Sequence, residues 1–434
     1  MTTLMTAPPM EADAFAPLYK RAPMELVRGD GVWLFDADDR AYLDFASGIA
    51  VNALGYNDAG IRVAMHGAME SGLIHTSNLF RTAPGERLAA ELVAHSFADH
   101  VFFCNSGAEA NEGAFKFARK WARAAGGLAK HEIIALRGSF HGRLFASVAA
   151  TDRPAYRLPF RPLAGGVSIA ERDEGELDVV LDAETVAAVI VEPIQGEGGV
   201  RIVEPALLEA LRRMTSERGI ALIFDEIQCG LGRTGRLFAY ERIGIEPDML
   251  TLAKPLAGGL PMGAVLMRKD IAAALAPGDH GTTFGGGPFV ASVALHVLDR
   301  LRDPALLAHV REAGAWFGDA LRDVMARSEK IRAVRGTGFM WGLDVVEPAA
   351  AIVTRARRRL ADPHGRRAHA ASAPSARDDE GRTGRRGASP RKRALGHNRQ
   401  DRVDCRRAAG RVSLVTLGAP AAIVVARARH PRRQ

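Results

Sequence analysis

The sequence predicts an α/β protein with a mostly parallel β-sheet, and two observations support this fold class. Between about residues 98 and 270, short apolar runs alternate with amphipathic stretches of helical length. Strands separated by helices are typical of βαβ units, whose strands run parallel and are buried on both faces. The expected strands are His100–Cys104, Glu132–Leu136, Ala188–Glu192, Ile220–Asp225, Met249–Ala253 and Gly263–Met267, and the expected helices are Ala108–Ala124, Pro205–Arg218 and Phe289–Ser328.

The chain of 434 residues is too long for one ordinary domain, so a second domain is expected. Alternating segments at Gly31–Phe35 and Ala41–Phe45 flank an Asp-rich turn and predict a hairpin. A further strand signal, Arg332–Val346, follows the long helical stretch. We expect these pieces from opposite ends of the chain to form a smaller α+β domain. The expected division is 1–60 for the start of the small domain, 61–290 for the large domain, 291–355 for a linking helix and the return to the small domain, and 356–434 for a tail.

The tail differs from the rest of the chain in composition. From residue 361 onward there are 18 Lys and Arg residues against 6 Asp and Glu, a local charge of +12, so the net charge of +8 leaves 8 − 12 = −4 for residues 1–360. All 27 aromatic residues lie before residue 361, and an Arg- and Ala-rich segment of this kind forms no packed core. The alternative is a tail that binds nucleic acid through its basic side chains. Because no aromatic residue accompanies the charge and Asp378–Glu380 interrupts it, we expect no nucleic-acid partner.

Composition also limits the compartment and the metal content. No apolar run is long enough to span a bilayer, and the N-terminal stretch is acidic where a secretory signal would be basic. The cysteines Cys104, Cys229 and Cys405 are few, odd in number and widely spaced, which suits a reducing compartment and gives no metal-ligand cluster. We therefore expect a cytoplasmic protein with no membrane contact and no metal site.

Two charged residues at the ends of buried strands carry the strongest functional signal. Asp225 ends an apolar run, and Lys254 follows another run 29 residues later, before a turn rich in Pro and Gly. In open α/β sheets, ligands bind at the carboxyl ends of the strands. A lysine amine there can condense with the aldehyde of pyridoxal phosphate, and a carboxylate can hold a proton on the pyridine nitrogen. The alternative is a buried Asp–Lys ion pair without a cofactor.

Three further motifs are weaker when each is taken alone. Asn105–Ala108 joins an expected strand to a helix and could bind a phosphate, although an N-cap with acidic residues in the first turn is the simpler interpretation. In GSFHGR, Phe140 could stack on a flat ring and Arg143 could bind a carboxylate, although an arginine in a loop is usually a solvated surface residue. In His280–Phe289, two hydroxyls stand in a Gly-rich turn that could approach a phosphate or could be an ordinary flexible loop.

Together and in this order, the motifs resemble those of the class III, ornithine-type aminotransferases. The resemblance runs from about Glu25 to about Val346, roughly three quarters of the chain. Its most specific parts are FDEIQCGLGRTG, which begins at Phe224, and TLAKPLAGGLPMGA, which contains Lys254. The resemblance implies the pyridoxal-phosphate-dependent transferase fold of type I, with pyridoxal 5'-phosphate as cofactor.

Roles follow from the resemblance position by position. Lys254 would be the catalytic residue that holds the cofactor covalently, with Asp225 on the pyridine nitrogen and Gln228 near the phenolic oxygen. Gly107 and Ala108 would cradle the phosphate, and Phe140 would stack on the ring. Thr283 would reach the phosphate of the neighbouring subunit's cofactor, which implies a homodimer. The substrate-binding residues would be Arg143 for the carboxylate, Thr282 and Glu197, with Glu192 as structural support.

The resemblance implies a specific reaction in arginine biosynthesis. The amino group of N2-acetyl-L-ornithine would pass to 2-oxoglutarate, giving N-acetylglutamate 5-semialdehyde and L-glutamate, with Lys254 moving a proton as general base and acid. Substrate choice depends on a few pocket contacts, so ornithine, succinylornithine, 4-aminobutyrate or a lysine carrier adduct stays open as the donor. An inactive relative is the other alternative.

The sequence departs from the family pattern in three places. Gly286–Pro288 replaces the usual GGNP, and Gly55–Asp58 replaces the usual GH(x)HP. The third departure is larger, because the small domain of the family continues past Arg355 with an Arg-Leu/Phe-x-Pro-Pro-Leu motif that is missing here. We interpret the tail as the translation of a shifted reading frame, and a disordered segment is the alternative.

Resequencing the coding DNA is expected to reveal a frame change near Arg355–Leu360, because aromatic residues and almost all lysines stop there. An intact frame together with confirmed peptides from residues 361–434 would contradict this interpretation. A real shift removes a substrate-facing arginine, so cofactor binding would persist while turnover becomes weak.

Overall fold

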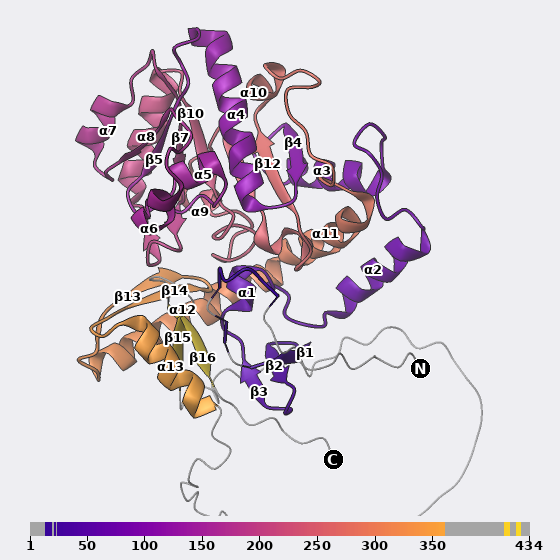
Figure 1. The fold of residues 1–434 in the computed structure, drawn as a ribbon, viewed down its shortest axis with the longest axis vertical. Helices are drawn as coiled ribbons and strands as arrows, with labels where there is room; N and C mark the ends of the chain where they lie inside the picture. Colours follow the sequence, from indigo (N-terminus) through magenta and orange to yellow (C-terminus); the bar gives the residue numbers. More distant parts are fainter. Residues whose placement is uncertain (1–13, 20, 23, 361–411, 417–421, 427–434) are drawn as a thin grey trace, which may run out of the picture.

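The computed structural model describes residues 14–19, 21–22, 24–360, 412–416 and 422–426. A seven-stranded sheet forms the centre of the larger part of the molecule (Figure 1), in the order β4-β12-β11-β10-β7-β5-β6. Only β12 runs antiparallel to its neighbours within this sheet, so the expected mostly parallel sheet is confirmed. The strands are β4 (His100–Cys104), β5 (Glu132–Leu136), β6 (Val167–Ala170), β7 (Val186–Val191), β10 (Ala221–Asp225), β11 (Met249–Leu252) and β12 (Gly263–Met267).

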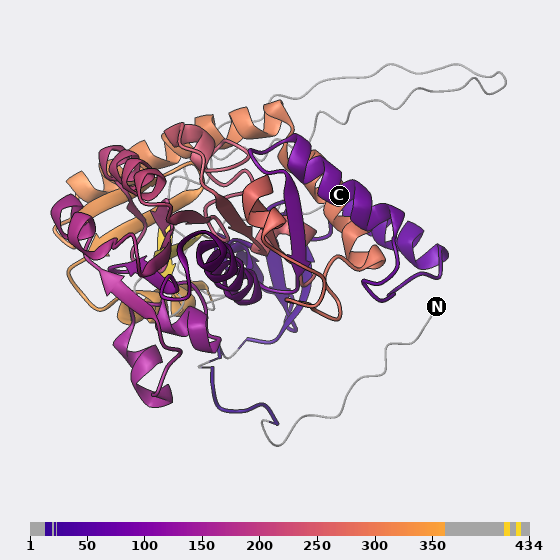
Figure 2. The same cartoon turned by 90° about the horizontal axis from the view of Figure 1, so that it is seen from above.

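Helices bury both faces of this sheet. Successive residues of β10 point to opposite sides: Leu222 and Phe224 join one core cluster, while Ala221 and Ile223 join the other. Helix α4 (Gly107–Gly126), seen nearly end-on in Figure 2, covers the second face. Because the faces of the central strands are buried, these strands are apolar at almost every position, and the sequence therefore predicts them as apolar runs. The first face is covered by α3 (Ala83–Ala94), α7 (Glu174–Val180), α8 (Pro205–Glu217) and α11 (Pro288–Leu301).

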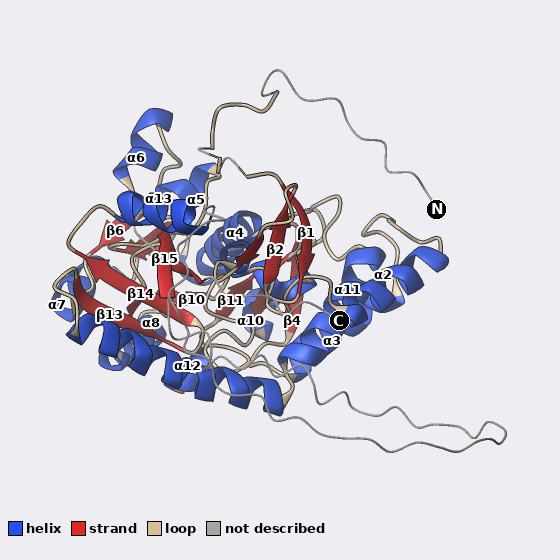
Figure 3. Ribbon diagram, turned by 90° about the horizontal axis from the view of Figure 1, so that it is seen from below, coloured by secondary structure: helices blue, strands red, loops and turns tan. Residues whose placement is uncertain are grey.

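The smaller part combines segments from distant regions of the chain (Figure 1). The expected N-terminal hairpin is present as β2 (Trp33–Asp36) and β3 (Ala41–Leu43), with β1 (Leu26–Asp30) added on its other edge. The later strand signal forms the antiparallel pair β13 (Ile331–Thr337) and β14 (Met340–Val345). In Figure 3, α12 (Pro304–Ala326) runs along β13, against which it packs. Further helices are α1 (Ser47–Ala50), α2 (Ala59–Glu70), α5 (Phe145–Ala149), α6 (Pro154–Arg157), η1 (Leu158–Phe160), α9 (Tyr240–Ile243), η2 (Lys254–Ala257) and α10 (Lys269–Ala273), and the short strands β8 (Ile194–Gln195) and β9 (Arg201–Ile202) form an antiparallel pair.

One expectation about helices needs correction. The single helix expected over Phe289–Ser328 is two helices, α11 and α12, which are separated at Arg302 and Asp303. The side chain of Asp303 caps α12 by accepting a hydrogen bond from the amide of Ala305 at 2.8 Å, and Pro304 lacks the N–H that a continuous helix would need. The last helix of the described chain is α13 (Ala349–Leu360).

Most of the tail lies outside the described residues, so the structure does not test its interpretation as a shifted frame. The described part of the tail holds an antiparallel pair of strands, β15 (Val412–Thr416) and β16 (Ala422–Ala426). Strand β15 lies against α13, and β16 lies beside β14 and β3. Within the described ranges, no helix has the length and apolar character required to cross a membrane.

Candidate active site

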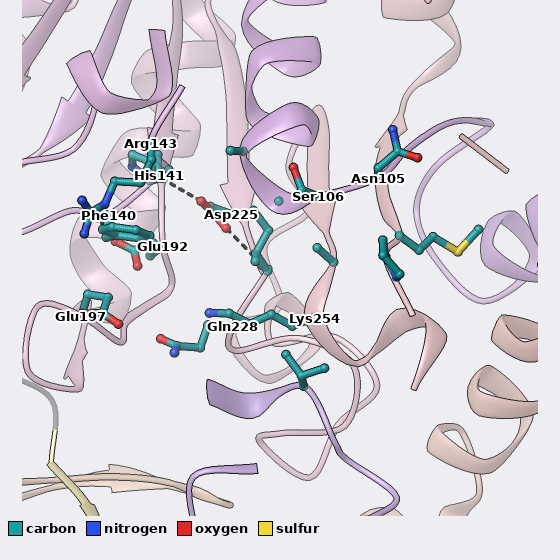
Figure 4. Close-up of a pocket in the computed structure, with 18 of the residues that line it drawn as sticks. Asn105, Ser106, Phe140, His141, Arg143, Glu192, Glu197, Asp225, Gln228 and Lys254 are labelled. Atoms are coloured by element: carbon teal, nitrogen blue, oxygen red, sulfur yellow. Dashed lines mark hydrogen bonds and ion pairs between the residues drawn. The ribbon is translucent and has the colours of Figure 1, made fainter. Parts of the chain in front are cut away.

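A cavity of about 430 Å³ opens at one edge of the central sheet (Figure 4). Six strands that run in the same direction end at this edge, and the segments at the ends of five of them contribute to the wall. The carboxyl ends of parallel strands are where ligands bind in open α/β folds. The contributions are Ser106 after β4, Phe140 after β5, Glu192 after β7, Asp225 at the end of β10 and Lys254 after β11.

Asp225 is held rigidly at the back of the cavity. Its Oδ2 accepts hydrogen bonds from Asn111 Nδ2 and from His141 Nδ1, both at 2.8 Å, and its Oδ1 accepts one from the amide of Ile227 at 3.1 Å. All three side chains are buried. A buried carboxylate with this many donors keeps one orientation.

Lys254 reaches the same cavity from the neighbouring strand. Strands β10 and β11 pair in parallel, so Asp225 and Lys254 leave the sheet at the same edge. Lys254 has a φ of 39°, a left-handed conformation that costs free energy in a residue with a Cβ atom and is typical of functional sites. Burial lowers the pKa of the Lys254 ammonium, against the opposing attraction of Asp225, Glu197 and Glu192. The amine is therefore more readily available in its uncharged, nucleophilic form.

The amino terminus of α4 forms another part of the wall. Ser106 caps the helix, because its Oγ accepts a hydrogen bond from the amide of Glu109 at 3.2 Å. The amides of Gly107 and Ala108 bond to no other described residue and stand at the positive end of a 20-residue helix. A Cβ atom at Gly107 would lie 2.8 Å from Cδ1 of Ile227, so only glycine lets the helix approach the turn after β10 this closely.

Two glutamates stand near Lys254. The pKa of the fully buried Glu192 is raised well above its usual value by burial and by the charge of Asp225, and its Oε2 accepts a hydrogen bond from the amide of Phe140 at 3.0 Å. Burial also raises the pKa of Glu197, although Lys254 and two arginines act in the opposite direction. Gln228 completes this wall, and its side-chain amide lies against Gly196, where a Cβ atom would require Gln228 to move.

The structure gathers the expected residues, with two exceptions. Gly107, Ala108, Phe140, Arg143, Glu197, Asp225, Gln228 and Lys254 all line the cavity. Thr282 and Thr283 instead line a second cavity of about 330 Å³ on the same chain. Thr282 Oγ1 accepts a hydrogen bond from Asn105 Nδ2 at 2.9 Å, and the side chain of Thr283 is exposed.

Sequence reasoning overlooked the two residues that hold Asp225. His141 lies between Phe140 and Arg143 in GSFHGR, and it could have been noticed as an imidazole inside a motif already assigned to the site. Asn111 lies four residues after Gly107, so the helical period places it on the same face of α4. Its role requires contact with a strand 114 residues away, which no local pattern reveals.

Comparisons with known proteins agree with this geometry. The family model for "Aminotransferase class-III" matches residues 14–359. This chain belongs to the class III aminotransferases. It is 46% identical to a mitochondrial acetylornithine aminotransferase of Alnus glutinosa over 340 residues, which cover 77% of this chain and 75% of that protein.

Solved structures give the same result. The N-acetylornithine aminotransferase of Stenotrophomonas maltophilia K279a superposes with a TM-score of 0.68 at 37% identity, over 78% of this chain and 86% of that one. An amine transaminase from an uncultivated Pseudomonas species, solved with bound pyridoxal phosphate, gives a TM-score of 0.73 at 28% identity, over 82% and 90% of the two chains. The protein is an aminotransferase of the pyridoxal-phosphate-dependent class, with the fold of these enzymes.

The residues of the cavity fit that cofactor. Unpaired amides of Gly107 and Ala108 at the positive end of α4 suit a phosphate. A fixed buried carboxylate at Asp225 suits a protonated ring nitrogen, and the ring of Phe140 suits a flat aromatic group. The buried amine of Lys254 suits condensation with an aldehyde.

Replacing Lys254 with Met is expected to change how the stability of the cofactor-free protein depends on pH. The folded pKa of Lys254 lies below the value of 10.5 that applies to the unfolded chain. Between these two values the unfolded chain binds more protons than the folded protein, so the free energy of unfolding rises with pH. Urea unfolding measured from neutral pH to pH 10.5 should show this rise in the wild type and a weaker rise in Lys254→Met. The same substitution at the exposed Lys330 serves as control, and parallel profiles for wild type and Lys254→Met would contradict the expectation.

Proposed function

We propose that this aminotransferase transfers the amino group of N2-acetyl-L-ornithine to 2-oxoglutarate, producing N-acetylglutamate 5-semialdehyde and L-glutamate. The observation that carries the proposal is the meeting of a fixed buried carboxylate, Asp225, and a desolvated amine, Lys254, at the ends of neighbouring parallel strands. The donor is taken from relatives that are named acetylornithine aminotransferases and are 42–46% identical to this chain. Such a reaction belongs to arginine biosynthesis.

The cofactor residues have separate tasks in this proposal. Lys254 binds the cofactor covalently, Asp225 holds a proton on its ring nitrogen, and Gln228 lies near its phenolic oxygen. Gly107 and Ala108 bind the phosphate, and Phe140 stacks on the ring. Bound pyridoxal phosphate supplies an electron-withdrawing ring that weakens the bonds at the substrate carbon attached to nitrogen.

Proton transfer belongs to Lys254. Its amine would accept the proton from the substrate carbon as general base and would deliver it to the C4′ carbon of the cofactor as general acid. Its lowered pKa favours the form that accepts a proton at neutral pH. Arg143 binds the substrate carboxylate, and Glu197 adjusts the site to the donor and to the oxo acid. Thr282 lies outside the cavity of Lys254 on its own chain, so its place beside the substrate would be at the site of the neighbouring subunit.

We propose a homodimer in which Thr283 serves the phosphate of the partner's cofactor. Thr283 is exposed and lies outside the cavity of Lys254 on its own chain. The neighbouring apolar side chain of Phe284 is 63% exposed. A hydrogen bond of 2.6 Å from Asn78 Nδ2 to the Thr282 carbonyl oxygen joins this loop to the segment that carries Leu79 and Phe80. Leu79 is 89% exposed and Phe80 is 69% exposed, which is typical of surfaces that another chain covers.

We further propose the domain division 1–60, 61–290 and 291–355, followed by a tail from residue 356 that is not the small domain of the family. The family match ends at residue 359, close to the point where aromatic residues stop. Cys104 and Cys229 form no disulfide within the described part of the chain, which is consistent with a cytoplasmic enzyme.

The decisive experiment compares the wild type with Lys254→Ala. The wild type should transaminate acetylornithine with 2-oxoglutarate and should prefer it to ornithine and to 4-aminobutyrate, while Lys254→Ala should lose activity by about a hundredfold or more. Lys330→Ala, at an exposed lysine, should behave as the wild type. Higher kcat/KM for another donor would overturn the choice of substrate. A visible cofactor band that no donor alters would identify an inactive relative.

The shared site can be tested by complementation between two inactive variants. Lys254→Ala lacks the amine, and Thr283→Asp is expected to repel the phosphate at the partner's site. Dissociation and reassociation of an equal mixture should place one intact site in each heterodimer, which restores about one quarter of the wild-type activity. Each variant treated alone should stay inactive, and absence of recovery in the mixture would place Thr283 at the site of its own chain.

A further inference from the structure

The guanidinium of Arg143 is positioned by an aromatic ring and by no polar partner among the described residues. Its Cζ lies 3.3 Å from the ring centroid of Tyr156 and 5.8 Å from that of Phe140. Arg143 makes no hydrogen bond or salt bridge within the described part of the chain, and its side chain is exposed at the wall of the cavity. All of its N–H donors are therefore open to an incoming ligand.

Contact with a ring leaves an arginine better able to bind a substrate carboxylate than an ion pair within the protein does. A guanidinium that lies against an aromatic ring is attracted by the π electrons and keeps its in-plane N–H groups free. A carboxylate partner in the protein would occupy the same donors that a substrate carboxylate must use. Fixing a long, rotatable side chain in advance also lowers the entropy lost when the ligand binds.

The short helix α6 connects Arg143 to the rest of the site. Tyr156, on α6, also contacts Phe140 edge to face, with centroids 6.3 Å apart and planes at 83°. At the start of α6, Arg153 donates a hydrogen bond to the backbone carbonyl of Glu197. The helix is thus attached to the loop of Glu197, and its Tyr156 ring lies against both Phe140 and Arg143.

We propose that Tyr156 is a positioning residue that presents Arg143 to substrate carboxylates, and that it thereby favours carboxylate-bearing substrates. This inference rests on the proposed function, in which Arg143 is the group that binds the carboxylate. Tyr156 acts through its ring, so its hydroxyl is dispensable.

Binding of glutarate, an unreactive dicarboxylate, to the cofactor-loaded full chain tests the inference by titration calorimetry. Tyr156→Leu should raise the Kd for glutarate by about five- to tenfold, the effect of losing one contact between a cation and a ring. Tyr156→Phe should bind as the wild type does. Leu158→Ala, at an exposed position just beyond α6, is the matched control for the segment. If Tyr156→Leu does not fold, Tyr156→Met replaces the ring with a flexible chain of similar length.

A double-mutant cycle separates positioning from a general structural effect. In the Arg143→Ala background, Tyr156→Leu should weaken glutarate binding no further, because the two residues act as one unit. By itself, Tyr156→Leu should raise KM for 2-oxoglutarate and leave both kcat and cofactor affinity nearly unchanged. The proposal would be overturned if Tyr156→Leu bound glutarate as the wild type does, or if Tyr156→Phe lost as much affinity as Tyr156→Leu. It would also be overturned if Tyr156→Leu still weakened binding in the Arg143→Ala background, or if the wild type did not bind glutarate. A wild type that binds glutarate and does not transaminate acetylornithine would refute only the proposed function.

Discussion

Burial of charged groups at one edge of the central sheet is the constraint on which the site depends. Lys254, Glu192 and Glu197 all have pKa values shifted toward their uncharged forms, and burial is the largest cause in each case. In water these side chains would be ionised and strongly hydrated. Inside the cavity, the amine becomes a nucleophile and the acids become weaker, which suits an enzyme that must form and break bonds to nitrogen near neutral pH.

The topology of the sheet explains how these groups meet. Six strands run in one direction, and five of them end at this edge with a residue at or just after the strand that lines the cavity. Strand β12 runs the other way, which lets the chain return from Lys254 and places the turn that contains Gly259 and Pro261 over the same cavity. Helices on both faces of the sheet exclude water from the strands. The sheet therefore forms an apolar base, and the polar groups of the site lie at its edge.

The cavity has a buried end and an exposed end. Asp225 is fixed by three donors, and the amino terminus of α4 abuts the turn after β10 at Gly107. At the opposite end, Arg143 is exposed and has only ring contacts among the described residues. A rigid buried end suits a resident cofactor, whose position must not change between turnovers. An exposed arginine whose N–H groups bond to no other described residue suits the carboxylates of two successive substrates.

The local composition of the chain was sufficient for much of this architecture. Strands such as β5 and β12 have the limits that the sequence predicts, because a strand buried on both faces must be apolar throughout. Strand β6 escaped notice because it lies at an edge of the sheet and alternates with partly exposed residues. The break between α11 and α12 depends on Asp303 and Pro304, a cap signal hidden within a long apolar pattern.

By itself, the sequence determined the fold class, the elements of the large sheet and the residue types placed after each strand, because periodicity and turn residues act over short distances along the chain. The three-dimensional structure alone decided which of these residues meet. The hydrogen bonds of Asn111 and His141 to Asp225, the separation of Thr283 from Lys254 and the contact of Tyr156 with Arg143 all join segments that are distant in sequence or that only a turn brings together. Such contacts are set by the packing of whole elements, and no local pattern of residues encodes them.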